Sequence, residues 1–113
     1  MEPINITRDN IESYIAVESS VNNKPILFYF TAPWCGPCKK FALELPTLIE
    51  EYKDTILFGK INVDDESELA KQYGVRSVPS FIVYNVGGEI VDRWTGVLSA
   101  IDIRKRLDLI VSA

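Results

Sequence analysis

The apolar segment Ile26–Thr31 constrains the fold of this chain more than any other part of the sequence. A short run of this kind, without polar alternation, is typical of a strand buried on both faces of a sheet. A loop with Cys35 and Cys38 follows it, and a helical stretch interrupted by Pro46 then covers residues 39–52. The sequence therefore predicts a central strand and a helix, with the two cysteines at the junction between them.

The remaining segments alternate between helical and extended patterns. Residues 8–20 have the spacing of a first amphipathic helix, with Thr7 and Asp9 as candidate caps. Gly87-Gly88 is expected to form a tight hairpin turn. The other expected elements are a short edge strand at 4–6, strands at 55–63, 80–86 and 89–95, a short helix at 67–73, and a final helix capped by Ser99 and Asp102.

This order of elements predicts an α/β fold in which a mixed central sheet carries helices on both faces. The first half gives a parallel strand–helix–strand unit with a right-handed crossover, and the hairpin at residues 80–95 adds antiparallel strands. A chain of 113 residues without repeats or linkers fits one domain, residues 1–113.

The composition excludes several kinds of function. The chain has no histidine, which removes the usual general base and the commonest metal ligand, and two cysteines alone cannot complete a zinc site. The net charge of −4 and the scattered basic residues argue against a nucleic-acid partner. The longest apolar run, Ile26–Phe30, is far too short for a membrane span. We therefore expect no metal, no cofactor, no nucleic acid and no membrane partner.

The position of the cysteines between a strand and a helix suits them for sulfur chemistry. Cys35 is expected at the helix N-cap and Cys38 in the first turn, close enough for their sulfurs to form a disulfide. The free amides and the positive end of the helix dipole favour a thiolate, so we expect a lowered pKa at Cys35. Pro37 suits an early helical position, and Gly36 lets another chain approach closely.

Two thiols at this spacing predict dithiol–disulfide exchange. Cys35, expected to be the more exposed, attacks a substrate disulfide, and Cys38 then attacks Cys35 and releases the reduced substrate. Two other interpretations stay open: half of a zinc or iron–sulfur site completed by a second chain, or an inert structural disulfide. A bridge over so small a loop removes little chain entropy, which argues against the structural disulfide.

The residues around the cysteines resemble the thioredoxin family. Residues 34–39 (WCGPCK) match its motif, Lys60–Asp64 resembles its KxNxD strand, and Tyr73–Ser80 resembles its YGVxxxPT segment. The likeness extends over nearly the whole chain. It implies a thioredoxin fold, a thiol–disulfide oxidoreductase that reduces protein disulfides, and a thioredoxin-reductase-like electron donor.

The same resemblance implies a substrate-binding surface around the first cysteine. This surface would comprise Trp34, Val78, Pro79, Gly96 and Val97. Pro79 should follow a cis peptide bond and present the backbone of Val78 to an extended substrate, in the manner of strand addition. Without the resemblance, Pro79 would be interpreted as a proline at the start of a strand, and Trp34 as a packing aromatic.

Some positions depart from the family pattern. Tyr29 stands where the family commonly has a buried Asp that helps to deprotonate the second cysteine, and Lys60 matches the lysine that partners this Asp. Tyrosine is a poor base near neutral pH, so we interpret Tyr29 as a core aromatic with a hydrogen-bonded hydroxyl. Deprotonation of Cys38 would then run through water or the departing thiolate, which would slow resolution. Pro46 lies three residues beyond the usual helix proline of the family.

Three functions compete. The first is a general protein-disulfide reductase, because Gly36-Pro37 between the cysteines resembles the reducing thioredoxins. The second is an extracytoplasmic oxidant or isomerase, and the third is an interaction module that uses the fold without turnover. We expect a monomer. We expect it in the cytoplasm, because Met1-Glu2-Pro3 is acidic and no long apolar stretch follows it; a periplasmic or secreted protein stays open if the N-terminus was trimmed.

Overall fold

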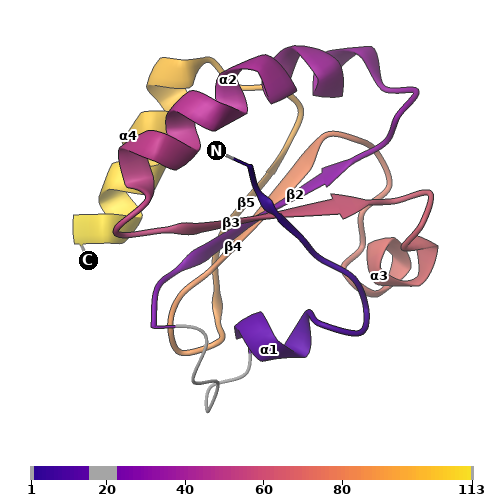
Figure 1. Cartoon of the computed structure of the whole chain (residues 1–113), viewed down its shortest axis with the longest axis horizontal. Helices are drawn as coiled ribbons and strands as arrows, with labels where there is room; N and C mark the ends of the chain where they lie inside the picture. Colours follow the sequence, from indigo (N-terminus) through magenta and orange to yellow (C-terminus); the bar gives the residue numbers. More distant parts are fainter. Residues whose placement is uncertain (1, 16–22, 113) are drawn as a thin grey trace.

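A computed structural model describes residues 2–15 and 23–112, and in them five strands form one sheet flanked by four helices (Figure 1). The strands are β1 (Ile4–Asn5), β2 (Ile26–Thr31), β3 (Leu57–Asn62), β4 (Ser80–Tyr84) and β5 (Ile90–Thr95). Their order in the sheet is β1-β3-β2-β4-β5, so β2 lies at the centre as predicted. The predicted mixed α/β architecture is confirmed.

The helices form two layers, one on each face of the sheet (Figure 1). They are α1 (Glu12–Ile15), α2 (Gly36–Tyr52), α3 (Ser67–Gln72) and α4 (Ala100–Ser112). β2 is buried at all six positions because its side chains alternate between the layers. Leu27 and Tyr29 belong to the cluster with α2 and α4, whereas Phe28 and Phe30 belong to the cluster with α1 and α3.

Strand pairing brings the cysteine loop next to a second loop. β2 runs parallel to β3 and antiparallel to β4, and Phe30 lies opposite Ser80. The last residues of β2 therefore meet the first residues of β4 at the same end of the sheet. Cys35 comes shortly after β2, and Pro79 comes just before β4, so the two loops converge although they are far apart in the sequence.

Helix α2 begins at Gly36, directly after the predicted N-cap Cys35 and three residues before the helical stretch expected at 39–52, and it continues through Pro46. The prediction that Pro46 interrupts the helix is wrong. Pro46 is exposed, so the carbonyl group that loses its amide partner can be hydrated while the helix continues. On the opposite side, buried Phe41, Leu45 and Leu48 pack in the cluster between α2 and the sheet.

The first helix differs from its predicted extent. Among the described residues α1 covers only Glu12–Ile15, and the segment before it forms turns. There Asn10 Oδ1 accepts the N–H of Thr7 (2.8 Å), and Thr7 Oγ1 accepts the N–H of Asp9 (3.2 Å). These side-chain bonds compete with helical backbone bonds and delay the start of the helix. Residues 16–20 of the predicted helix lie outside the described residues.

The last three elements agree closely with the sequence. β4 ends before the predicted residue 86 because Asn85 Oδ1 accepts backbone N–H groups of the hairpin turn, including that of Gly87 (2.9 Å). The register of β5 shifts between the partners of Val83 and Tyr84, and Val91 is the extra residue of this bulge. Ser99 Oγ accepts the N–H of Asp102 (3.2 Å), which confirms the predicted cap of α4.

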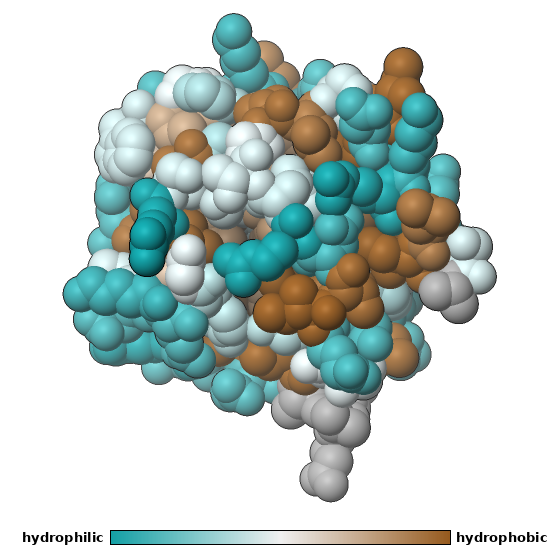
Figure 2. All heavy atoms as spheres, turned by 180° about the vertical axis from the view of Figure 1, so that it is seen from behind, coloured by the Kyte–Doolittle hydropathy of each residue, from teal (hydrophilic) through white to brown (hydrophobic). Residues whose placement is uncertain are grey.

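A shallow apolar hollow of about 760 Å³ lies at the end of the sheet away from the cysteines. Its walls include Pro25, Val86, Val91 and Leu109. On the face opposite to that of Figure 1, hydrophobic residues gather in patches beside hydrophilic ones (Figure 2). None of the described helices is long and apolar enough to cross a membrane.

Candidate active site

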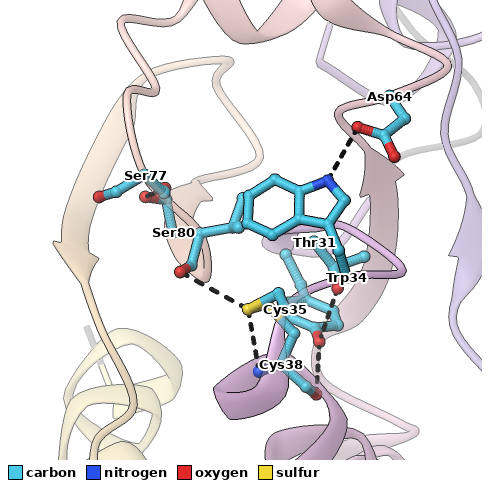
Figure 3. Close-up of a disulfide and its surroundings, with 9 residues drawn as sticks. Thr31, Trp34, Cys35, Cys38, Asp64, Ser77 and Ser80 are labelled. Carbon is cyan, nitrogen blue, oxygen red and sulfur yellow. Dashed lines mark hydrogen bonds between the residues drawn. A yellow bond between two sulfur atoms is a disulfide. The ribbon is translucent and has the colours of Figure 1, made fainter.

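The two cysteines lie where the sequence predicts them. Cys35 is the N-cap of α2, with φ −86° and ψ 110°, and Cys38 lies in the first turn. They form a disulfide with their Cα atoms 5.3 Å apart (Figure 3). The N–H of Cys38 points at Cys35 Sγ at 3.2 Å, so a free amide of the helix terminus already faces the sulfur that would carry a negative charge.

The exposure of Cys35 differs from the prediction. Cys35 is 4% exposed and Cys38 2%, so both cysteines are buried and the expected contrast between them is small. The reason is that the loop before β4 closes over Cys35: its Sγ lies 3.7 Å from the carbonyl oxygen of Val78. A substrate has to approach this sulfur closely. Gly36 and Pro37 beside it are exposed, and a Cβ at Gly36 would meet no protein atom within 4 Å, so the glycine keeps space open for a partner rather than for packing.

The loop that faces Cys35 has a defined backbone. The Val78–Pro79 peptide bond is cis, as the resemblance implies. Pro79 is buried, and its carbonyl oxygen accepts the N–H of Gly96 (2.9 Å). Gly96 has a φ of +91°, a conformation that favours glycine, and it carries the chain from β5 toward the exposed Val97. The predicted residues of the β4 and β5 loops are thus brought together beside the cysteines.

Two hollows flank the disulfide. One, of about 450 Å³, is lined by Gly36, Pro37, Lys40 and Val97. The other, of about 170 Å³, has Trp34 and Val78 among its lining residues, together with Arg76 and Ser77 from the segment before β4. Of the predicted substrate-surface residues, Val97 therefore lines one hollow, and Trp34 and Val78 line the other.

Trp34 lies on the surface directly before Cys35 and is 68% exposed. Its Nε1 donates to Asp64 Oδ1 at 3.2 Å, as Figure 3 shows, so the ring is held in one orientation despite its exposure. An exposed indole fixed in this way can contact a partner without first losing side-chain freedom. A role for Asp64 was not evident from the sequence, where only its place in the Lys60–Asp64 strand motif pointed toward it.

Tyr29 lies behind the disulfide, on the side toward the core. Its hydroxyl donates to the carbonyl oxygen of Cys38 at 3.0 Å and lies 3.1 Å from Thr31 Oγ1. Burial raises the pKa of Tyr29 above its ordinary value, and the hydrogen bond with Thr31 only partly offsets this. Tyr29 therefore stays neutral near pH 7, and the predicted core aromatic with a hydrogen-bonded hydroxyl is confirmed.

Lys60 lies beside Tyr29 in the sheet, since the two residues are register partners of β3 and β2. Its side chain is exposed, and it has no ion-pair partner among the described residues. Lys60, Tyr29 and Cys38 all line a cavity of about 440 Å³ next to α2. The described residues contain no group of three or more His, Cys, Asp or Glu side chains that could hold a metal ion.

Sequence reasoning missed Lys40, Arg76 and Ser77, which line the two hollows. Lys40 follows Gly36 by four positions, so helical periodicity alone could have placed it on the same side of α2. The segment with Arg76 and Ser77 carried no local signal, because its position depends on the pairing of β4 with β2.

The comparisons with known proteins agree with this geometry. The family model for thioredoxin matches residues 3–108 of the chain. The chain is 37% identical over 91 residues to a thioredoxin of Pyropia yezoensis, covering 80% of this chain and 84% of that protein. It is 36% identical over 87 residues to a thioredoxin of Chlorobaculum thiosulfatiphilum, covering 77% and 80%. It is 35% identical over 92 residues to thioredoxin 1 of Synechococcus elongatus, covering 81% and 82%.

Proposed function

Because the chain belongs to the thioredoxin family it is a thiol–disulfide oxidoreductase, and we propose that its physiological direction is the reduction of disulfides in protein substrates. The observation that carries the exchange chemistry is the disulfide between Cys35 and Cys38 at the N-terminus of α2, with the Cys38 amide aimed at Cys35 Sγ. An amide in that position stabilises a thiolate at Cys35 more than the neutral thiol. The reducing direction rests on the likeness of the chain to thioredoxins.

The reaction uses the two sulfurs in sequence. The Cys35 thiolate attacks one sulfur of the substrate disulfide, and the other substrate sulfur leaves as a thiolate. Cys38, after losing its proton, attacks Cys35 Sγ and displaces the second substrate thiolate. The substrate gains two electrons, and the chain ends as the Cys35–Cys38 disulfide. A reductase-type donor then returns two electrons to this pair.

The surface around the disulfide suits an extended protein substrate. The carbonyl group of Val78 lies next to Cys35 Sγ, where a substrate backbone could pair with it by strand addition. Trp34 supplies a fixed apolar contact on one side, and Gly36, Pro37 and Val97 line the other. Pro79 and Gly96 hold the backbone of this surface in place.

We further propose that the chain acts as a monomer in the cytoplasm.

The reduction potential of the Cys35–Cys38 pair tests the direction of the reaction. Equilibration against glutathione or dithiothreitol buffers, read out by thiol alkylation, gives the potential directly. We expect a value below about −260 mV, more reducing than the cytosolic glutathione pool. A value at or above about −200 mV would instead support the oxidant or isomerase.

Serine variants separate exchange from simple binding. Cys38→Ser should trap a mixed disulfide between Cys35 and a substrate protein, visible on a non-reducing gel. The double variant Cys35→Ser/Cys38→Ser should lose this species and all reductase activity. Unchanged capture of the same partners by the double variant would favour the interaction module, because pure binding needs neither thiol.

A further inference from the structure

Resolution of the mixed disulfide requires Cys38 to lose its proton in a buried position. Cys38 is 2% exposed, and a buried thiol ionises less readily than one in water. Tyr29 is the nearest ionisable side chain in the core, but its hydroxyl is donated to the Cys38 carbonyl group, and burial raises its pKa. Tyr29 is therefore not a proton acceptor for Cys38.

Cys38 also lines the cavity next to α2. Its volume of about 440 Å³ is enough for several water molecules. Five of its lining residues have titratable or charged side chains: Tyr29 from β2, Cys38 and Lys39 from α2, Lys60 from β3, and Glu2 from the N-terminal segment. Glu2 is the single carboxylate among the described residues of this lining.

The fold brings Glu2 to this place through β1. Ile4 and Asn5 pair in parallel with Gly59 and Lys60 of β3, so Glu2 lies two residues before a strand that is paired with β3. Figure 1 shows the chain entering β1 from beside α2. Lys39 and Lys60 line the same cavity, so a thiolate formed at Cys38 would face positively charged side chains.

We propose that Glu2 accepts the proton of Cys38, through water in this cavity, when Cys38 resolves the mixed disulfide. The proton passes from Cys38 Sγ to water and from water to the Glu2 carboxylate. The Cys38 thiolate then attacks Cys35 Sγ, the bond between Cys35 and the substrate sulfur breaks, and the substrate leaves as a thiolate. Glu2 releases its proton to that thiolate or to solvent. This inference rests on the proposed dithiol exchange.

The test compares Glu2→Gln with Glu89→Gln, which makes the same change in net charge on the exposed β4–β5 hairpin. The reduced protein is mixed with a saturating disulfide peptide in a stopped-flow instrument, so that the plateau rate reports the resolving step. Near pH 7 we expect Glu2→Gln to slow this step about tenfold, less than a directly placed base would give, and Glu89→Gln to leave it unchanged. Near pH 10 hydroxide removes the proton, and the difference should vanish.

Two further variants separate this inference from the proposed function. In a Cys38→Ser background the second-order attack of Cys35 should be the same with and without Glu2→Gln, because Glu2 serves only the second step. Absence of any mixed disulfide in that background would contradict the proposed function itself. Tyr29→Asp supplies a carboxylate at the core side, so Glu2→Gln should have no effect in that protein once thermal unfolding confirms that it is folded.

Equal plateau rates for the wild type and Glu2→Gln near pH 7 would overturn the inference, as would an equal slowing by Glu89→Gln. A Glu2→Gln effect that persists undiminished at pH 10 would also overturn it, because it would then reflect structure rather than proton transfer.

Discussion

At the scale of single residues, Tyr29 determines the environment behind the disulfide. Its ring packs against Phe41 and Phe81, with centroids 4.9 Å and 5.5 Å away, while its hydroxyl reaches the carbonyl group of Cys38. The aromatic ring thus fills the core, and the polar end ties the core to the first turn of α2. Neither contact lets Tyr29 act as a base.

The variant Tyr29→Phe tests whether the Tyr29 hydroxyl has a structural role and no catalytic one. It keeps the ring but removes the hydroxyl, so we expect the free energy of unfolding to fall by about 1 kcal/mol, the usual contribution of one buried hydrogen bond. The rate of disulfide exchange near pH 7 should not change. Urea unfolding and an insulin-reduction assay measure the two quantities. A large loss of exchange with unchanged stability would contradict the structural role.

Single residues also mark the limit of what the sequence could predict at the site. The helix N-cap position of Cys35 follows from local order, because a strand, a loop and a helix succeed one another directly. The near-complete burial of Cys35 could not be predicted, since it depends on the Val78 loop and hence on strand pairing. The approach of Glu2 to the cavity was equally hidden, because it depends on the pairing of β1 with β3.

At the scale of elements, α4 shows how a cap and an apolar face together place a helix. Ser99 Oγ accepts the N–H of Asp102, and Ile103 and Leu107 are fully buried on one side. Both features were readable from the sequence because they are local. The extent of α1 was not, since the side chains of Thr7 and Asn10 make bonds that compete with helix formation.

The variant Ser99→Ala measures how much the cap of α4 contributes to stability. Loss of the side-chain acceptor should lower the free energy of unfolding by about 1 kcal/mol. Ser112→Ala is the matched control at the other end of the same helix, where the hydroxyl is exposed and donates to the Leu109 carbonyl group (3.2 Å). We expect the control to change stability by less than about 0.5 kcal/mol. Equal effects of the two variants in urea unfolding would contradict the assignment of Ser99 as the cap.

At the scale of the whole molecule, buried tyrosines couple stability to alkaline pH. Burial raises the pKa of Tyr29, Tyr52, Tyr73 and Tyr84 above the ordinary tyrosine value. For Tyr52, whose hydroxyl donates to Asp108 Oδ1 at 2.7 Å, the neighbouring carboxylate raises it further. The folded state therefore holds these protons more tightly than the unfolded chain does.

The sign of the effect follows from this difference. Below pH 10 both states keep their tyrosine protons and the stability is fully present; above it the unfolded chain ionises first and stability falls. At pH 11 we expect a loss of about 1 kcal/mol for each tyrosine that stays protonated in the folded state. Urea unfolding at pH 8 and pH 11 measures the loss. Tyrosinate absorbance from Tyr29, Tyr52, Tyr73 or Tyr84, assigned by single Tyr→Phe variants, that appeared near pH 10 in a still folded protein would contradict the prediction.

The overall architecture was the most predictable level. The alternation of strands with helical segments specifies a mixed sheet. The apolar run Ile26–Phe30 specifies its centre, because only a strand covered on both faces avoids polar alternation. The exact ends of strands were less predictable. β4 ends where Asn85 binds the hairpin amides, a side-chain effect that strand periodicity does not report.

The two outer strands have a consequence for crowded conditions. β1 is only two residues long, and β5 carries the bulge at Val91. Short or irregular borders of this kind discourage one molecule from extending the sheet of another, which is how many sheet proteins resist aggregation. The backbone of the Val78 loop can thus pair with a substrate, while the edge strands β1 and β5 give a second copy of the chain little backbone to pair with. We expect it to remain dispersed at concentrations where proteins with long flat borders would precipitate.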